Sequence, residues 1–271
     1  MICYYLNSAG VKIDFMRYPY HLLTGEFFDY EWEEVTYSNK IYGFGRRFFE
    51  KDLKIDVFCR KEDFAGAINA LEDAVSVDRI NNTPGRLYVN GEYLSCFIKA
   101  VKKEEWEAGI YTIVTLSLIS DMPFWISEEK RTFYRRTNAG TNSGLDYPFD
   151  YSFEYMTSDV GIENWYINSA GACPFTIIIY GPVTNPRLLL NGHPYEVFTT
   201  LEANEHLILD TRTHQITKYL SNGTTENLYN NRLMEQSVFD PIGPGAVIIA
   251  WPGTFGFDID AYIERSEPLW R

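Results

Sequence analysis

The sequence has few of the residues that bind metals or form cross-links. It contains four cysteines and four histidines in 271 residues. No two cysteines form a CxxC pair, and the histidines do not have the spacing of metal ligands. We therefore expect neither a disulfide nor a metal site. Cys59 and Cys96 lie beside phenylalanines in strand-like runs, which predicts small, buried hydrophobic side chains.

Long hydrophobic runs are also missing. No apolar stretch approaches the ~20 residues that a membrane-spanning helix needs. The first residues, MICYYLNSAGVKID, have neither the basic start nor the apolar centre of a secretory signal peptide. We therefore expect a protein that is made and used in a cytosol.

Positive charge is scarce in the second half of the chain. Residues 1–140 carry 18 Lys and Arg against 21 Asp and Glu, whereas residues 141–271 carry 6 against 16. The formal net charge of the whole chain is −13. An acidic surface repels phosphates and anionic lipids, so we expect no binding to nucleic acid or to a membrane.

Catalytic motifs are absent as well. The chain has no GxSxG elbow, no Walker A sequence and no GxGxxG loop, so we expect no enzyme activity and no cofactor. Asp258 and Asp260 would share one face of a strand, about 7 Å apart, which a glycosidase pair tolerates. Outward-facing polar residues of an ordinary strand give the same pattern, and we favour that interpretation. We interpret Glu31, Glu33 and Glu34 as a solvated strand edge that prevents mispairing.

Aromatic residues and turn signals dominate what is present. Phe, Trp and Tyr make up 16% of the chain, and they suit the pleated surface of β-sheets. Asn90-Gly91 separates two alternating runs and predicts a type I′ hairpin. Residues 111–119 read as a long strand. The charged residues 102–109 read as a turn, and Gly43 and Gly45 as breaks in the segment that holds them.

One stretch has the pattern of a helix, residues 62–75. Phe64, Ile68, Leu71 and Val75 recur at the spacing of a single helical face. Acidic residues open the segment, where the helix dipole favours them. Such a stripe predicts a helix that packs against the sheet of the N-terminal half.

The C-terminal half predicts a second set of strands and no helix. At least seven short strands alternate with turn signals, which indicates a β-sandwich or jelly roll. Residues 137–146 are small and polar and predict a linker between a domain of residues 1–136 and a domain of residues 147–271. If the sandwich binds carbohydrate, Trp165 and Trp251 would supply the stacking platform.

Taken in order, these features resemble the distal tail (Dit) proteins of long-tailed phages that infect Gram-positive bacteria. The likeness covers nearly the whole chain. It rests on the opening strands with Gly10 and Asp14, the helix, the hairpin of residues 86–91, the strand that ends in Ser120-Asp121-Met122-Pro123-Phe124-Trp125, and the segment GLDYPFDY at residues 144–151.

The resemblance implies a structural protein without catalytic residues. The N-terminal domain, β-rich with one bracing helix, would form a six-membered ring or a pair of stacked rings. The C-terminal domain would be a galectin-like sandwich. Implied partners are the tail tube protein, a tail-tip or tail-associated lysin protein, and a receptor-binding protein, at the tail tip of a virion assembled in the host cytoplasm. We expect Phe64, Ile68, Asn90 and Gly91 at or near the ring interface. The alternative is a protein that binds host-surface glycans through its sandwich.

Overall fold

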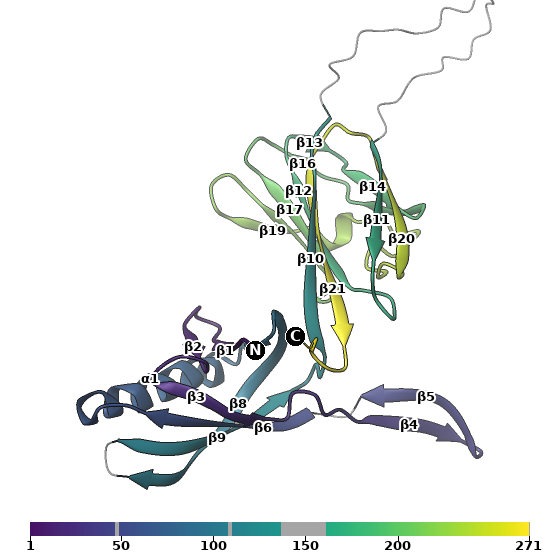
Figure 1. The fold of residues 1–271 in the computed structure, drawn as a ribbon. Coiled ribbons are helices and arrows are strands. Elements are labelled where there is room, and N and C mark those ends of the chain that lie inside the picture. Colours follow the sequence, from purple (N-terminus) through teal and green to yellow (C-terminus); the bar gives the residue numbers. More distant parts are fainter. Residues whose placement is uncertain (47–48, 108–109, 137–160, 271) are drawn as a thin grey trace, which may run out of the picture. The chain divides into compact units, whose positions relative to one another are not determined.

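A computed structural model of the chain describes residues 1–46, 49–107, 110–136 and 161–270 (Figure 1). The strands group into two compact units. Unit 1 holds Met1–Ser127 together with Glu264–Arg271, and unit 2 holds Glu128–Ile263. The chain therefore passes from one unit to the other twice. The mainly β fold class predicted from the sequence is confirmed.

Unit 1 is built from antiparallel strands that share one long member, β8 (Glu92–Glu107). The first residues of β8 pair with β7, and the later ones pair with β9. Two ladders therefore meet along this strand, with the orders β2-β1-β7-β8 and β3-β6-β9-β8. Their other members are β1 (Cys3–Leu6), β2 (Lys12–Asp14), β3 (Tyr20–Gly25), β6 (Phe49–Phe58), β7 (Gly85–Val89) and β9 (Tyr111–Ser120).

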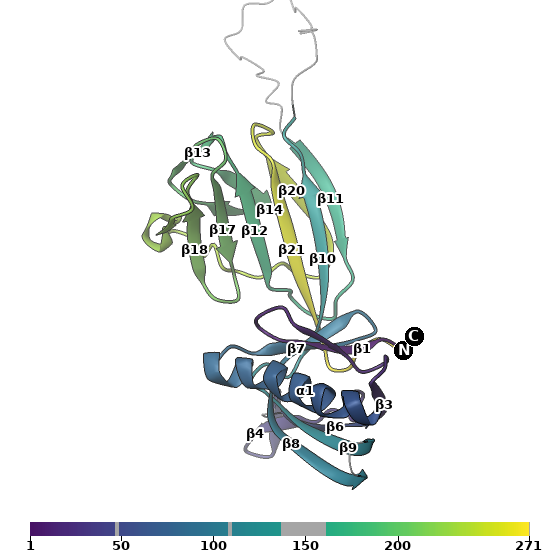
Figure 2. The same cartoon turned by 90° about the vertical axis from the view of Figure 1, so that its left-hand side faces the viewer.

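The helix α1 (Lys61–Asn81) covers these strands (Figure 2). Its buried face includes Ala67, Leu71 and Val75, so the predicted helix and its apolar stripe are confirmed. The helix continues six residues beyond the predicted end. It stops where Asn82 adopts a left-handed conformation, with φ of 48°.

A buried carboxylate fixes the last turn of α1. Asp78 is fully buried and accepts hydrogen bonds from the Tyr5 hydroxyl at 2.5 Å and from the Ser8 backbone N–H at 2.7 Å. Burial, followed by the neighbouring Cys96 and Asp78, raises the pKa of Tyr5. The tyrosine therefore stays protonated and keeps its donor for the carboxylate, which ties the helix to β1.

Two predictions about strand breaks are wrong. Residues 102–107 are not a turn, because they continue β8 and pair with β9 through to Glu107. Gly43 and Gly45 do not interrupt a strand either, since both lie inside β5 (Lys40–Arg46). In both places pairing with a neighbouring strand outweighs the local residue preferences.

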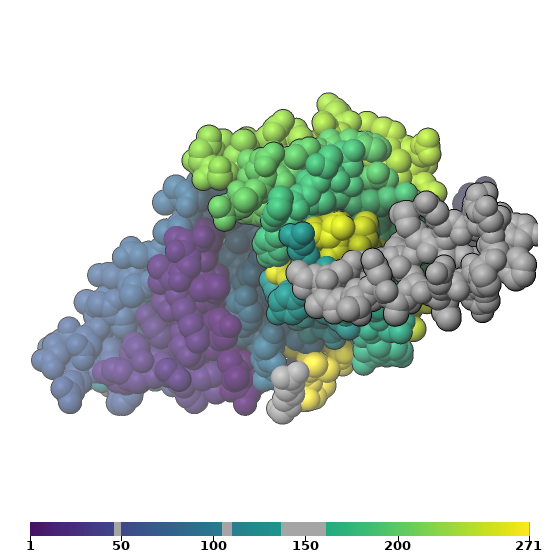
Figure 3. Space-filling view, turned by 90° about the horizontal axis from the view of Figure 1, so that it is seen from above, coloured from purple at the N-terminus to yellow at the C-terminus, as the bar shows by residue number. Residues whose placement is uncertain are grey.

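Unit 2 is a β-sandwich, as the sequence predicts. One sheet has the order β19-β18-β17-β12-β21-β10, and the facing sheet has the order β11-β20-β14-β15. A single core that includes Phe175, Leu209, Ile249 and Trp251 fills the space between them. In the space-filling view of Figure 3, yellow residues near the C-terminus lie between the green middle strands and the teal segment of β10.

The strands of the first sheet are β10 (Trp125–Phe133), β12 (Phe175–Tyr180), β17 (His206–Asp210), β18 (Gln215–Tyr219), β19 (Thr225–Asn227) and β21 (Phe257–Arg265). Those of the second are β11 (Gly161–Ile167), β14 (Arg187–Leu190), β15 (His193–Glu196) and β20 (Gly245–Trp251). A short pair, β13 (Val183–Thr184) and β16 (Thr200–Leu201), and a 3-10 turn, η1 (Tyr229–Asn231), complete the unit. Strand β11 has no counterpart in the sequence prediction.

The units divide differently from the predicted domains. The first boundary falls after Ser127 and not after residue 136, because β10 continues into the sandwich. The last eight residues return to unit 1, which the sequence did not indicate. The predicted linker, residues 137–146, and the segment GLDYPFDY lie outside the described residues.

Three smaller expectations bear on function. All four cysteines are buried with free thiols, including Cys59 and Cys96 as predicted. Among the described residues, no helix is both long and apolar enough to cross a membrane. The same residues contain no cluster of three or more His, Cys, Asp or Glu side chains that could hold a metal ion.

Candidate interaction surfaces

One exposed apolar surface of unit 1 is a two-stranded ribbon, which consists of β4 (Trp32–Tyr37) and β5 (Lys40–Arg46). Among the described strands, β4 and β5 pair only with each other. All six residues of β4 are exposed. Large apolar side chains are more than half exposed on both strands: Val35, Tyr37, Ile41, Tyr42 and Phe44. Figure 1 shows the two strands as a separate ribbon, and their apolar side chains are not covered by the rest of unit 1.

One face of the ribbon, here called the glycine face, has little side-chain cover. Val35 lies opposite Gly43, and Glu33 lies opposite Gly45. A Cβ atom placed on Gly43 would meet no atom within 4 Å. The backbone of β5 is therefore accessible on this face, beside the exposed side chains of Val35, Tyr37 and Glu33.

Unit 1 also has an open groove of about 750 Å³ at the start of α1, here called the α1 groove. It is lined by Tyr18, Phe58, Cys59, Arg60, Lys61, Asp63 and Ile110. Three of these are exposed apolar residues, Tyr18, Phe58 and Ile110. Two are cations, and the Arg60 side chain is 81% exposed. One lining residue, Asp63, is an anion, so the groove combines apolar side chains with two cations and one carboxylate.

The sequence singled out neither surface. The segment around β4 was predicted only to expose its glutamates, and these are exposed. Its aromatic residues carried the missed signal, because Trp32, Tyr37, Tyr42 and Phe44 recur on both sides of a Ser-Asn turn. A strand pair with apolar residues on both faces needs cover on both faces, and a reading of one strand at a time does not reveal this.

The predicted ring residues of the helix lie at the edge of the core of unit 1. Phe64 and Ile68 are partly buried and pack against that core. Most of the apolar stripe of α1 is therefore used to hold the helix on its own sheet. The exposed parts of these two side chains lie at the edge of the buried face of the helix, and they do not form a second apolar face.

The predicted hairpin turn is confirmed, and its asparagine has a structural task. Asn90 and Gly91 have φ of 52° and 94°, as a type I′ turn requires. Asn90 is only 7% exposed. Its Oδ1 accepts a hydrogen bond from the Ile2 backbone N–H at 3.2 Å, and its Nδ2 donates to the Leu269 carbonyl at 2.9 Å. Asn90 therefore joins both chain ends to the turn.

The next residue completes this attachment of the C-terminal tail. Glu92 is 2% exposed and accepts a hydrogen bond from the Leu269 backbone N–H at 2.8 Å. Arg265 Nε lies 3.8 Å from the other carboxylate oxygen of Glu92. The Trp270 ring stacks on Phe28 at 3.9 Å between centroids. We call these contacts, together with those of Asn90, the tail clasp.

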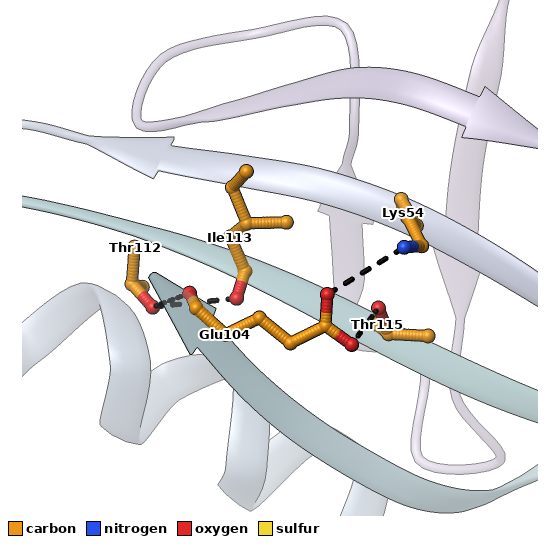
Figure 4. Close-up of polar contacts among 5 residues, drawn as sticks. All are labelled: Lys54, Glu104, Thr112, Ile113 and Thr115. Carbon is orange, nitrogen blue, oxygen red and sulfur yellow. Dashed lines mark hydrogen bonds and ion pairs between the residues drawn. The ribbon is translucent and has the colours of Figure 1, made fainter. Parts of the chain in front are cut away.

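The charged end of β8 is stabilised by contacts within its own sheet (Figure 4). Glu104 lies 3.5 Å from Lys54 Nζ and accepts a hydrogen bond from the Thr115 hydroxyl at 3.4 Å. The Thr112 hydroxyl donates to the backbone carbonyl of Glu104 at 3.2 Å. Lys54 and Glu104 are about half exposed, so each contact contributes less than ~1 kcal/mol. This arrangement supports strand pairing, and none of its groups has the geometry of a catalytic site.

The two aspartates considered for catalysis lie on β21 beside one lysine. Lys130 Nζ lies 3.0 Å from Asp258 and 3.8 Å from Asp260, and the Tyr180 hydroxyl donates to Asp258 at 3.0 Å. Burial raises the pKa of Asp258, but hydrogen bonds from Lys130 and Tyr180 outweigh it and leave the pKa below its usual value. Burial and then the adjacent Asp258 raise the pKa of Asp260. The lysine occupies the space between the carboxylates, which a substrate would need.

The predicted glycan platform is wrong in its residues. Trp165 is 9% exposed and Trp251 is 2% exposed, and both belong to the core of the sandwich. Trp251 packs edge-on against Phe133 and Phe257, and its Nε1 donates to the Phe255 carbonyl at 3.2 Å. Neither indole offers a face on which a sugar can stack.

Comparison with known proteins finds structures and no sequence relatives. No protein-family model matches the chain, and no curated protein matches it. A chain of the phage p2 baseplate, solved in its activated conformation with Ca, is similar with a TM-score of 0.64 and 10% identity. The match covers 98% of this chain and 99% of that one. The Sr form of that baseplate gives a TM-score of 0.62, 11% identity and the same two coverages.

The SPP1 Dit protein is similar over its whole length. The TM-score is 0.60 at 10% identity, with 98% of this chain and 100% of that chain covered. That protein is described as a paradigm of the hub of the adsorption apparatus in phages that infect Gram-positive bacteria. The resemblance to Dit proteins is thereby confirmed for the fold, and it includes both units.

Proposed function

We propose that the chain is a structural subunit of a phage tail baseplate, in which it forms the hub. The observation that carries this proposal is the likeness to the SPP1 Dit protein and to the p2 baseplate chain across almost the full length of all three chains. The likeness extends over both β-rich units and is not limited to one of them, which supports a shared structural role.

The finer parts of the proposal concern assembly. Unit 1 forms a ring of six subunits that joins the tail tube protein to a tail-tip or tail-associated lysin protein. Unit 2 is available to a receptor-binding protein. The location is the tail tip of the virion, after assembly in the host cytoplasm. The exposed apolar ribbon supports a protein that functions as an oligomer, because such area is unfavourable in a soluble monomer.

The chemistry of the surfaces favours a structural role over an enzyme. In the parts of the chain that the structure describes, one lysine contacts both members of the carboxylate pair, and the histidines form no metal-binding cluster. Glycan binding remains the alternative. Trp165 and Trp251 lie in the core, so they cannot supply its stacking platform.

The proposal is tested by the mass of the purified full-length chain in solution. Light scattering is measured over a hundredfold range of concentration, and the particles are then viewed by negative-stain electron microscopy. We expect about six or twelve subunits and ring-shaped particles with a central channel. A monomer at every concentration would overturn the self-assembling hub.

A further inference from the structure

We propose that the glycine face of the ribbon of one subunit docks onto the α1 groove of the next copy of this chain in the ring. This inference rests on the proposed hub function and names the surfaces that would hold the ring together. The occupant of the groove is thus a second copy of the chain and not a different tail protein.

The ribbon needs a cover that unit 1 does not provide. An isolated pair of strands is only marginally stable in water, and it becomes stable when a further strand or an apolar surface covers one face. Val35 is 55% exposed and Tyr37 is 74% exposed. Both point to the glycine face, where Gly43 and Gly45 let a partner approach the backbone of β5 closely.

The α1 groove complements this face in apolar character and in its charged groups. Its exposed apolar residues, Tyr18, Phe58 and Ile110, match Val35 and Tyr37 in character. Opposite charges on the two surfaces would also set the register, because complementary charges steer partners toward one orientation.

The charges themselves come from a few exposed groups. Both surfaces carry both signs: Arg60, Lys61 and Asp63 line the groove, and Glu33 and Lys40 lie on the glycine face. Arg60 contacts only the exposed Glu62 among the ion pairs described, at 3.8 Å, so its guanidinium remains accessible to a partner. A carboxylate brought to Arg60 would gain a planar, two-pronged donor.

The two surfaces are too far apart to meet within one subunit. Strand β6 follows the ribbon in the chain and ends at Phe58 in the groove. Its ten residues span about 33 Å. A ribbon that binds a groove must therefore bind the groove of another copy. Donor and acceptor surfaces differ, so the contact is heterologous, and repetition by rotation closes a ring.

The first test places a side chain on the glycine face. Gly43→Val puts a β-branched residue in a strand position where its Cβ meets no atom within 4 Å, so the subunit should fold as before. Gly171→Val in unit 2 is the matched control, since a Cβ there also meets open space. We expect Gly43→Val to raise the concentration for half-assembly by at least about tenfold, which corresponds to losing a central interface contact, and the control to leave it unchanged.

The second test exchanges charges and does not depend on packing. Glu33→Lys and Arg60→Glu should each weaken assembly about tenfold, because each places like charges together. The double variant should recover assembly to within about threefold of the original chain, because the pair is restored with its signs reversed. Circular dichroism and thermal unfolding of each variant should match those of the original chain.

The outcomes separate the two proposals. If the original chain assembles and the variants assemble equally well, the proposed ribbon contact is wrong, but the hub function is unaffected. The ribbon would then be a surface that binds another tail protein. If the charge-exchanged double variant stays as weak as the singles, the two surfaces do not meet and the inference is wrong. If the original chain is a monomer at every concentration, the self-assembling hub falls and this inference falls with it.

Discussion

Replacement of Asn90 by glycine separates its role in the tail clasp from a role in the ring. Glycine adopts the positive φ of the type I′ turn without cost, so the hairpin keeps its shape. The change removes the two side-chain hydrogen bonds, from the Ile2 N–H at 3.2 Å and to the Leu269 carbonyl at 2.9 Å. Glu92 still holds the Leu269 N–H. The tail should therefore open more often without leaving its place permanently.

The expected size follows from these two bonds. A typical intramolecular hydrogen bond contributes about 1 kcal/mol net, and that amount changes a local opening equilibrium about fivefold. The assay is hydrogen–deuterium exchange followed by mass spectrometry of peptides from each end of the chain. We expect amides in residues 264–270 and around Ile2 to exchange about five times faster in Asn90→Gly.

A matched control exists in unit 2. Asn191 occupies the same position in a second type I′ turn, with φ of 52°, and its Oδ1 accepts a hydrogen bond from the Ile248 N–H at 2.7 Å. Asn191→Gly should leave exchange of the tail unchanged. Unchanged tail exchange in Asn90→Gly, together with a loss of assembly, would refute the clasp and place Asn90 in the ring interface.

Three further changes test which interactions stabilise each unit internally. Asp78→Ala should lower the stability of unit 1 by about 1–3 kcal/mol, because it removes the carboxylate that accepts the short hydrogen bond from the buried Tyr5 hydroxyl. Calorimetry should show almost no effect of Asp73→Ala on the exposed side of α1. Trp251→Ala should lower the free energy of unfolding of the sandwich by about 3–5 kcal/mol, which calorimetry would show as a transition at lower temperature. Unchanged stability would contradict its place in the core. The lowered pKa of Asp258 contributes stability that is present above the ordinary pKa of aspartate and is lost as pH falls through the lowered value. In Lys130→Met an NMR titration should show the pKa of Asp258 rising and this acid-sensitive contribution shrinking.

Local chemistry explains which elements the sequence predicts well. Asn90-Gly91 predicts its turn because few other residue pairs accept two positive φ angles in succession. The repeat of Leu71 and Val75 predicts a helix face because 3.6 residues make one turn. In each case the information lies within a few residues, so no knowledge of distant partners is needed.

Elements that depend on a distant partner are the ones that the sequence misses. Residues 102–107 look like a turn because they are charged, yet pairing with β9 and the contacts of Glu104 with Lys54 and Thr115 make them a strand (Figure 4). The predicted exposure of Trp165 and Trp251 is wrong for the same reason. Trp165 and Trp251 belong to strands, but the exposure of a strand face depends on which sheet covers it.

The same dependence on distant partners changes which surface best suits the proposed ring. A surface can hold a neighbour only if its apolar area and hydrogen-bonding groups are still free in the subunit. Asn90 is engaged with both chain ends, and Phe64 and Ile68 are partly committed to the core of unit 1. The ribbon retains its apolar side chains in solvent. The ribbon and the α1 groove are different surfaces at opposite ends of β6. A contact between them is therefore head-to-tail, and each subunit binds the next one in the same direction. A closed ring of identical subunits requires that property, and a symmetric contact of α1 with its own copy would give only a dimer.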